Sequence, residues 1–301
     1  MFWPVRILAV VLTSLGLSGC AHTNITPGFL EKVPALDPQD FTCCAEPERF
    51  YPAGLIRAAF ALAEKFGPSA ARTIYGGYEE KGYPGRLAGN AAAETALTAQ
   101  LQPLDLVFTG NKSYLWGAII PGRFSHDLVY LGTEAQLRHA RLWDLPALAP
   151  LRDDIRAGRL FIEAAAPATK TTDAASVLES DAVAILRPEL SVAARHSAYT
   201  ALARSIGVPY DYTFEIATTD RLACTELVNL AMPGLRLTTR AAYGHRVIFP
   251  DDIVAQAIRG EQLRLVGYMV GSEGGFAWRN THSLMADIAA YWGLPGSNPG
   301  K

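Results

Sequence analysis

A cysteine at the start of an expected helix and a histidine at the start of an expected strand are the residues of this chain best suited to chemistry. Cys224 opens the run Cys224–Val228, and His126 stands far earlier, in the run Phe124–Gly132. A free thiol has a pKa of about 8.5, and a helix amino terminus and a nearby imidazolium both favour its thiolate. Together the two residue types predict nucleophilic catalysis by Cys224 with His126 as the base.

Each of these residues also has an ordinary structural interpretation. Free cysteine is among the residue types most often simply buried, and a lone histidine in a strand is commonly a hydrogen-bonded core group. Glu163 lies in the apolar run Phe161–Ala164, where an unpaired carboxylate is costly, so it is expected to take a partner and to orient the imidazole. Strand alternation puts Glu163 on the face of Phe161, and a half-exposed surface position is the alternative.

The amino-terminal residues resemble a bacterial lipoprotein signal. Arg6 supplies a positive charge, Ile7–Leu15 is an apolar stretch too short to span a bilayer, and Leu17–Cys20 closes it with small residues. The resemblance implies cleavage of residues 1–19, acylation of Cys20 and anchoring to a membrane through that lipid. No aspartate follows Cys20, which favours the outer membrane, facing the periplasm. The alternative is an ordinary secretory signal followed by a chance cysteine.

The composition predicts a single globular domain behind this anchor. Apolar residues make up 50% of the chain, charged residues make up 19%, and the formal net charge is -2. This near-neutral balance, without a cluster of lysine or arginine, gives no reason to expect nucleic acid as a partner.

The cysteine count predicts one free thiol. With Cys20 acylated, the remaining thiols are Cys43, Cys44 and Cys224. The adjacent Cys43 and Cys44 form a vicinal disulfide, pair between molecules or stay reduced, and the sequence does not choose among the three. The odd number makes Cys224 the natural candidate for the free thiol.

Periodicity and helix breakers divide the residues before the core into two parts. Residues 20–50 contain several prolines and little regular spacing, and are expected to form a tether. Residues 51–102 are expected to be a helical addition, with helices over Gly54–Phe66 and Ala91–Leu101 and a loop over Tyr75–Gly89.

Residues 103–270 are expected to form the core of the catalytic domain, which spans residues 51–301. Short runs rich in β-branched and aromatic residues predict an α+β fold, with an antiparallel sheet or small barrel packed against helices. The expected strands are Leu104–Thr109, Trp116–Ile120, His126–Leu131, Arg159–Ala164, Asp181–Leu186 and Leu263–Val270. The expected helices are Ser191–Ile206, capped by Ser191, then Cys224–Met232, and one that starts at Pro250.

Five motifs in order carry a family resemblance. They are Leu104–Phe108, Phe124–Gly132, Phe161–Ala164, Tyr210–Phe214 and Cys224–Val228. This set, from about Pro103 to Ile253, resembles the YiiX/YebB-like branch of the NlpC superfamily, whose papain-like fold is circularly permuted so that the histidine strand precedes the cysteine helix.

The resemblance implies a role for each matching residue. It implies Cys224 as nucleophile, His126 as base and Glu163 as the group that orients the imidazole. Tyr210 and Asp211 match a signature near the site, where they either bind substrate or brace the fold. The chain departs from the family at two positions: Asp127 stands where a small or apolar residue is usual, and Leu104 stands where a glycine is common.

The expected function is hydrolysis of amide or peptide bonds through a Cys224 acyl-enzyme, with cell-wall peptides among the expected substrates. One alternative is an acyltransferase or lipase acting on lipid-linked acyl groups. Another is a non-catalytic lipoprotein that binds a ligand. No metal or cofactor is expected, because no pair of the other histidines has metal-ligand spacing.

Overall fold

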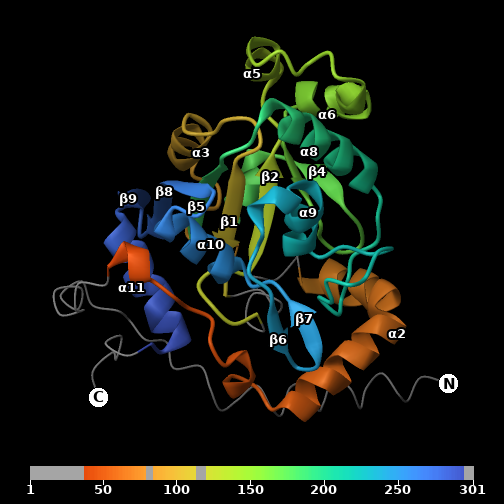
Figure 1. Cartoon of the computed structure of the whole chain (residues 1–301), viewed down its shortest axis with the longest axis vertical. Coiled ribbons are helices and arrows are strands. Elements are labelled where there is room, and N and C mark those ends of the chain that lie inside the picture. The colour runs from red at the N-terminus through yellow and green to blue at the C-terminus, as the bar shows by residue number, and fades with distance from the viewer. Residues whose placement is uncertain (1–36, 79–83, 113–119, 295–301) are drawn as a thin grey trace. The chain divides into compact units, whose positions relative to one another are not determined.

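The computed structural model describes residues 37–78, 84–112 and 120–294, and a seven-stranded sheet runs through them (Figure 1). Its strands are β1 (Leu106–Gly110), β2 (His126–Tyr130), β3 (Phe161–Glu163), β4 (Lys170–Thr172), β5 (Ala182–Pro188), β8 (Leu263–Ser272) and β9 (Gly275–Arg279). They lie in the order β4-β3-β2-β1-β5-β8-β9, and every neighbouring pair is antiparallel. The sheet is open, so the chain forms the expected α+β fold with a sheet and not a barrel. A separate hairpin joins β6 (Arg240–Ala242) to β7 (His245–Val247).

The helices begin and end where local signals place them. They are α2 (Ala53–Tyr78), α3 (Ala91–Thr98), α5 (Glu134–His139), α6 (Arg152–Arg156), α7 (Ala174–Val177), α8 (Val192–Ser205), α9 (Cys224–Ala231), α10 (Pro250–Arg259) and α11 (Thr281–Trp292). Ser191 caps α8 by accepting a hydrogen bond from the amide of Ala194, at 3.2 Å. Gly260 ends α10 with a φ of 75°, a left-handed conformation that glycine adopts at little cost.

Strand alternation gives the sheet two apolar faces. On one face, side chains such as Leu106, Phe108 and Val129 join a core with α8, α9, α10 and α11. On the other face, Val107 and Leu128 pack with α3 and α7. Both faces of β1, β2 and β5 are therefore buried.

Most of the expected elements are confirmed, with differences at their ends and edges. The helix expected over Gly54–Phe66 continues as α2 to Tyr78, so the loop expected from Tyr75 starts later, and residues 79–83 lie outside the described part. The strand expected over Trp116–Ile120 falls almost wholly on residues outside the described part. The sequence did not predict the edge strands β4 and β9.

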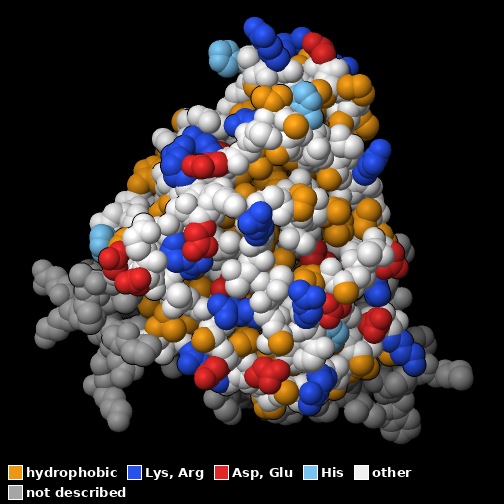
Figure 2. Space-filling model, viewed as in Figure 1, with side chains coloured by type: hydrophobic (Ala, Val, Ile, Leu, Met, Phe, Trp, Pro, Cys, Tyr) orange, Lys and Arg blue, Asp and Glu red, His pale blue; other side chains and the backbone are white. Residues whose placement is uncertain are grey.

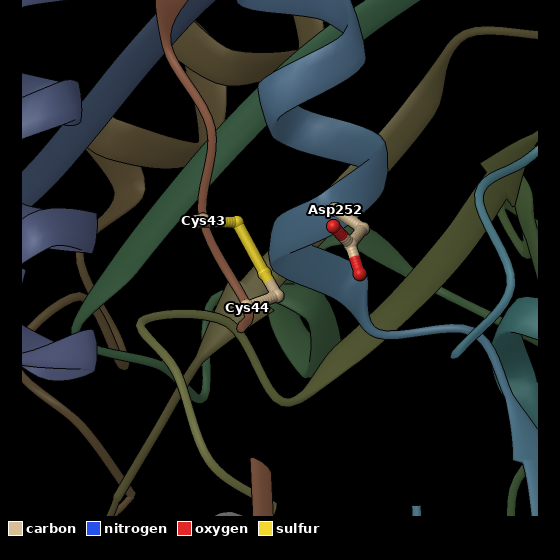
Figure 3. A group of neighbouring side chains, drawn as sticks. All are labelled: Cys43, Cys44 and Asp252. Carbon is tan, nitrogen blue, oxygen red and sulfur yellow. A yellow bond between two sulfur atoms is a disulfide. The ribbon is translucent and has the colours of Figure 1, made fainter. Parts of the chain in front are cut away.

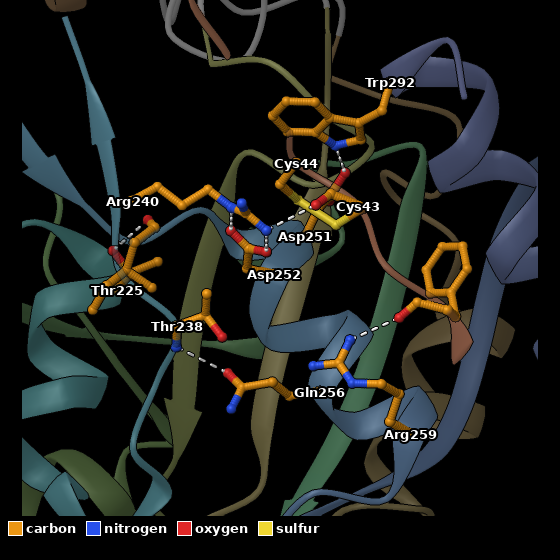
Figure 4. A network of polar contacts seen from close by, with 12 residues as sticks. Cys43, Cys44, Thr225, Thr238, Arg240, Asp251, Asp252, Gln256, Arg259 and Trp292 are labelled. Carbon is orange, nitrogen blue, oxygen red and sulfur yellow. Dashed lines mark hydrogen bonds and ion pairs between the residues drawn. A yellow bond between two sulfur atoms is a disulfide. The ribbon is translucent and has the colours of Figure 1, made fainter. Parts of the chain in front are cut away.

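The expected tether does not extend to residue 50. Phe41, Cys43 and Cys44 are buried in the same core as α10, and Cys43 and Cys44 form a vicinal disulfide. Arg259 donates to the carbonyl oxygen of Phe41 at 2.7 Å, and Arg240 donates to that of Cys43 at 2.8 Å (Figure 4). Residues 37–50 are therefore part of the domain. The expected signal and Cys20 lie outside the described residues.

The disulfide lies beside Asp252, and the three side chains together have the donor atoms of a metal site (Figure 3). Those donors already have partners. The two sulfur atoms are bonded to each other, and the Asp252 carboxylate binds Arg240 through bonds of 2.6 and 2.8 Å. The group is thus an ion pair against a disulfide and not a set of metal ligands.

The surface shows mixed charge. On the face in Figure 2, Lys and Arg side chains of the described residues are interspersed with Asp and Glu side chains. Within the described part of the chain, no helix is long and apolar enough to cross a membrane.

Candidate active site

Cys224 is the first residue of α9, a helix that packs against β2. Its side chain is buried, and it is the one free cysteine among the described residues. Glu226 holds the start of the helix by accepting a hydrogen bond from the amide of Ala223 at 2.7 Å. The backbone N–H groups of Asp127 and Thr225 approach the sulfur as weak hydrogen-bond donors.

The amide of Asp127 reaches the sulfur because β2 and β3 separate there. These strands pair only at Val129 with Ile162 and at Tyr130 with Phe161. The N–H of Leu131 points toward β3, and backbone alternation turns the N–H of Asp127 to the same side. Because β3 does not pair with β2 at Asp127, the N–H of that residue is free to face the Cys224 thiol.

His126 and Glu163 are in direct contact. The Nε2 of His126 and the Oε2 of Glu163 are 2.6 Å apart, and Lys170 lies on the far side with its Nζ 3.8 Å from Oε1. Burial alone would lower the pKa of His126, but the hydrogen bond and charge of Glu163 outweigh it and raise that pKa. Glu163 occupies Nε2, which leaves Nδ1 as the other ring nitrogen; among the described residues no hydrogen bond or ion pair joins His126 to Cys224.

The expected shift of the thiol pKa is wrong in sign. A helix amino terminus and an imidazolium were expected to favour the thiolate. In the structure, burial raises the pKa of Cys224 well above its ordinary value, and the negative charge of Asp127 raises it further. The two backbone N–H groups at the sulfur oppose this rise and do not overcome it.

An apolar pocket reaches the thiol. It is a hollow that is partly open to solvent. The described part of its wall is almost entirely apolar and aromatic and comes from α2, the β6–β7 hairpin, the start of α10 and the loops beside them. The residues are Tyr51, Ile56, Phe60, Ile120, Pro121, Phe214, Ala242, Tyr243, Val247, Ile248, Phe249 and Pro250, with Cys224 and Thr225 at one side. A reacting group at the sulfur therefore has an apolar environment beside it.

Comparison with protein families matches residues 100–271 to the permuted papain-like amidase enzymes of the YaeF/YiiX family. The match covers more than half of the chain and includes both the histidine strand and the cysteine helix. The chain belongs to this family. Comparison with curated proteins gave no match, and neither did comparison with solved structures. As a permuted papain-like amidase, the protein is an amide hydrolase of the cysteine type.

The contacts of Tyr210 and Asp211 in this amidase are those of a loop brace. Asp211 is fully buried, and its Oδ1 accepts hydrogen bonds from the amide and hydroxyl of Thr213 at 2.8 and 2.7 Å. The ring of Tyr210 packs edge-on against Tyr212 and Phe214. Contact of Tyr210 or Asp211 with substrate stays a prediction.

Asp251 is a site-positioning residue whose role sequence reasoning missed. Its carboxylate accepts hydrogen bonds from the amides of Arg123 and Phe124 at 2.7 and 2.8 Å, and from the indole Nε1 of Trp292 at 2.7 Å. These bonds join α10 and α11 to the segment just before β2. Figure 4 shows the one between Asp251 and Trp292. The sequence predicted a helix start at Pro250, but the hydrogen-bond partners of Asp251 are distant in the sequence and could not be predicted from it.

Replacing Glu163 with glutamine is expected to lower kcat/KM of the amidase about 10²-fold. The amide keeps an acceptor for the Nε2–H of His126 but removes the charge that raises the pKa of the ring, so the imidazolium form is lost at lower pH. The pH dependence of kcat/KM measures this shift. Lys170→Gln is the matched control, because its exposed ion pair at 3.8 Å is worth little and should change kcat/KM only slightly. Equal effects of the two substitutions would contradict the role of Glu163.

Proposed function

We propose that this amidase cleaves amides whose acyl group is apolar, through an acyl-enzyme on Cys224. The observation that carries the proposal is the apolar pocket that reaches the thiol. A polar cell-wall peptide would bring charged groups, and the described pocket wall has no charged side chain to meet them. An acyl chain needs no such partner, and burial of each methylene contributes about 0.8 kcal/mol.

The proposed reaction has two halves. In the first, the Cys224 sulfur attacks the amide carbonyl, its proton passes to His126, and the C–N bond breaks as the imidazolium protonates the leaving amine. In the second, His126 takes a proton from water, the resulting hydroxide attacks the thioester, and the C–S bond breaks to release a carboxylic acid while His126 returns its proton to the Cys224 sulfur. Glu163 balances the positive charge that His126 carries between these transfers.

The oxyanion of each tetrahedral intermediate needs hydrogen-bond donors. The first amides of a helix have no acceptor within it, and Cys224 is the first residue of α9. Its backbone N–H is therefore the proposed donor, in a place where water is largely excluded.

A series of N-acyl 4-nitroanilides tests the proposed acyl specificity. We expect kcat/KM to rise from acetyl to decanoyl by as much as about fourfold per methylene, until the pocket is filled. Val247→Trp, which places a large ring in the pocket wall, should shorten the best chain, whereas Val192→Trp on the exposed start of α8 should leave it unchanged. A rate independent of chain length, or faster cleavage of a cell-wall peptide, would refute the proposal.

The same pocket also favours a second candidate, transfer of the acyl group to an amine. The thioester on Cys224 would be the shared intermediate, and only the acceptor would differ. Product analysis with and without an added primary amine separates the two. A free carboxylic acid in both cases indicates hydrolysis, and an N-acyl product that replaces it indicates transfer.

A further inference from the structure

Asp127 follows His126 in β2 and meets the nucleophile from the other side of the strand. Successive side chains point to opposite faces, so His126 lies on the face of Leu128, and Asp127 lies on the face of Val129, which α9 covers. Asp127 is 1% exposed. The helix α9 packs against β2 on that face, and the thiol of Cys224, its first residue, interacts with the Asp127 carboxyl.

The carboxylate of Asp127 lacks the partners that a buried acid normally has. Among the described residues, no N–H or O–H group donates a hydrogen bond to either of its oxygens. Asp105 and Asp251, two other buried acids of this domain, each accept several such bonds. A buried carboxylate without donors is costly, so its ionised form is disfavoured.

The charges around Asp127 are few. On its own strand, the charge of His126 favours the carboxylate, and from α9 the thiol of Cys224 does so more weakly. Glu163 on β3 and Lys170 on β4 lie behind His126 and act on its ring. Burial outweighs these effects and raises the pKa of Asp127 to about 7. The group therefore changes charge in the neutral range of pH.

We propose that Asp127 is a further catalytic residue that sets the protonation state of the nucleophile. As a carboxylate it accepts the S–H of Cys224 and holds the sulfur as a thiol. As a carboxylic acid, with a proton taken from solvent, it donates to the sulfur and supports the thiolate, whose own proton goes to His126. The consequence for turnover rests on the proposed function, whereas the consequence for the thiol does not.

The sign of the expected pH dependence follows from these two states. Above pH 7, Asp127 is charged and raises the pKa of the thiol; below pH 7, the carboxyl is neutral and this repulsion is gone. Wild-type kcat/KM is thus expected to fall as pH rises through about 7. In Asp127→Asn, the neutral amide donates to the sulfur at every pH, and kcat/KM is expected to persist to higher pH.

Alkylation of Cys224 by iodoacetamide between pH 5 and pH 10, followed by mass spectrometry, tests the proposal without any amide substrate. We expect the midpoint in Asp127→Asn to lie at least about one pH unit below that of the wild type, a tenfold gain in thiolate at a given pH. Asp127→Ala should shift the alkylation midpoint in the same direction. It is a second variant, in which the side chain is smaller and the packing around residue 127 is disturbed in a different way. Asp153→Asn, which removes an exposed aspartate from α6, should leave it unchanged.

Each outcome of this experiment is decisive. An unshifted midpoint in both Asp127 variants, with melting curves that show them folded, would overturn the role of Asp127 whatever the amidase assay gives. A shifted midpoint together with no cleavage of any N-acyl amide would support Asp127 and refute the proposed function. Cys224→Ala provides the background for labelling elsewhere.

Discussion

Cys224→Ala is expected to lower amide hydrolysis by at least about 10⁴-fold and leave the fold intact. The sulfur forms the bond to the acyl group in the proposed reaction, and among the described residues there is no second free thiol to replace it. Alanine keeps the helix start, because Glu226 caps α9 through the amide of Ala223 and not through residue 224. The measurement is kcat/KM with an N-decanoyl anilide, beside a thermal melt of each protein.

Cys224→Ser sharpens this test. Serine keeps the size and hydrogen-bonding capacity of the side chain, but its hydroxyl is a far weaker nucleophile than a thiolate. The serine variant should therefore be nearly as inactive as the alanine variant. Intact mass spectrometry should detect an acyl adduct on the wild type alone. Activity within tenfold of the wild type in either variant would place the nucleophile elsewhere.

Asp251→Ala is expected to cost about 3 kcal/mol or more of the free energy of unfolding. Its carboxylate satisfies three donors, the amides of Arg123 and Phe124 and the indole of Trp292, and each donor left buried without a partner costs about 1–3 kcal/mol. Two of these donors lie just before β2, so kcat/KM should also fall as His126 loses its fixed place. Urea unfolding measures the first effect, and the anilide assay measures the second.

Asp252→Ala is the matched control for Asp251, since it removes the same group from the next residue of α10. Asp252 pairs with one side chain, Arg240, whose guanidinium is partly exposed and can be hydrated when the carboxylate is gone. Its loss should cost less and should leave kcat/KM nearly unchanged. If the order of the two variants were reversed, the bonds from Asp251 would not be what holds the segment before β2.

The elements that the sequence predicted well are those with local signals. Ser191 and Gly207 bracket α8, and Pro250 opens α10, because caps and breakers act within one turn. The edge strand β4, with the polar run Lys170–Thr172, has no such signal. It is a strand only because β3 lies beside it, which depends on contacts distant in the sequence.

The contact between His126 and Glu163 was predictable from the sequence, and the electrostatics of the Cys224 thiol were not. Alternation placed Glu163 on the face of Phe161, and its contact with His126 is found there. The thiol pKa was predicted with the wrong sign, because the sequence does not tell which face of β2 the cysteine helix covers. If α9 covered the other face, the Asp127 side chain would be exposed to solvent. Its burial beside Cys224 is therefore known only from the structure.

The bonds of Asp251 also set an order of events for the newly made chain. The segment before the histidine strand is held by a carboxylate on α10, and that carboxylate is shared with Trp292 at the end of α11. A ribosome-bound chain that carries Cys224 and His126 but stops short of Trp292 has one of these three bonds missing. The segment before the histidine strand is therefore expected to reach its full stability only after α11 has been synthesised and docked.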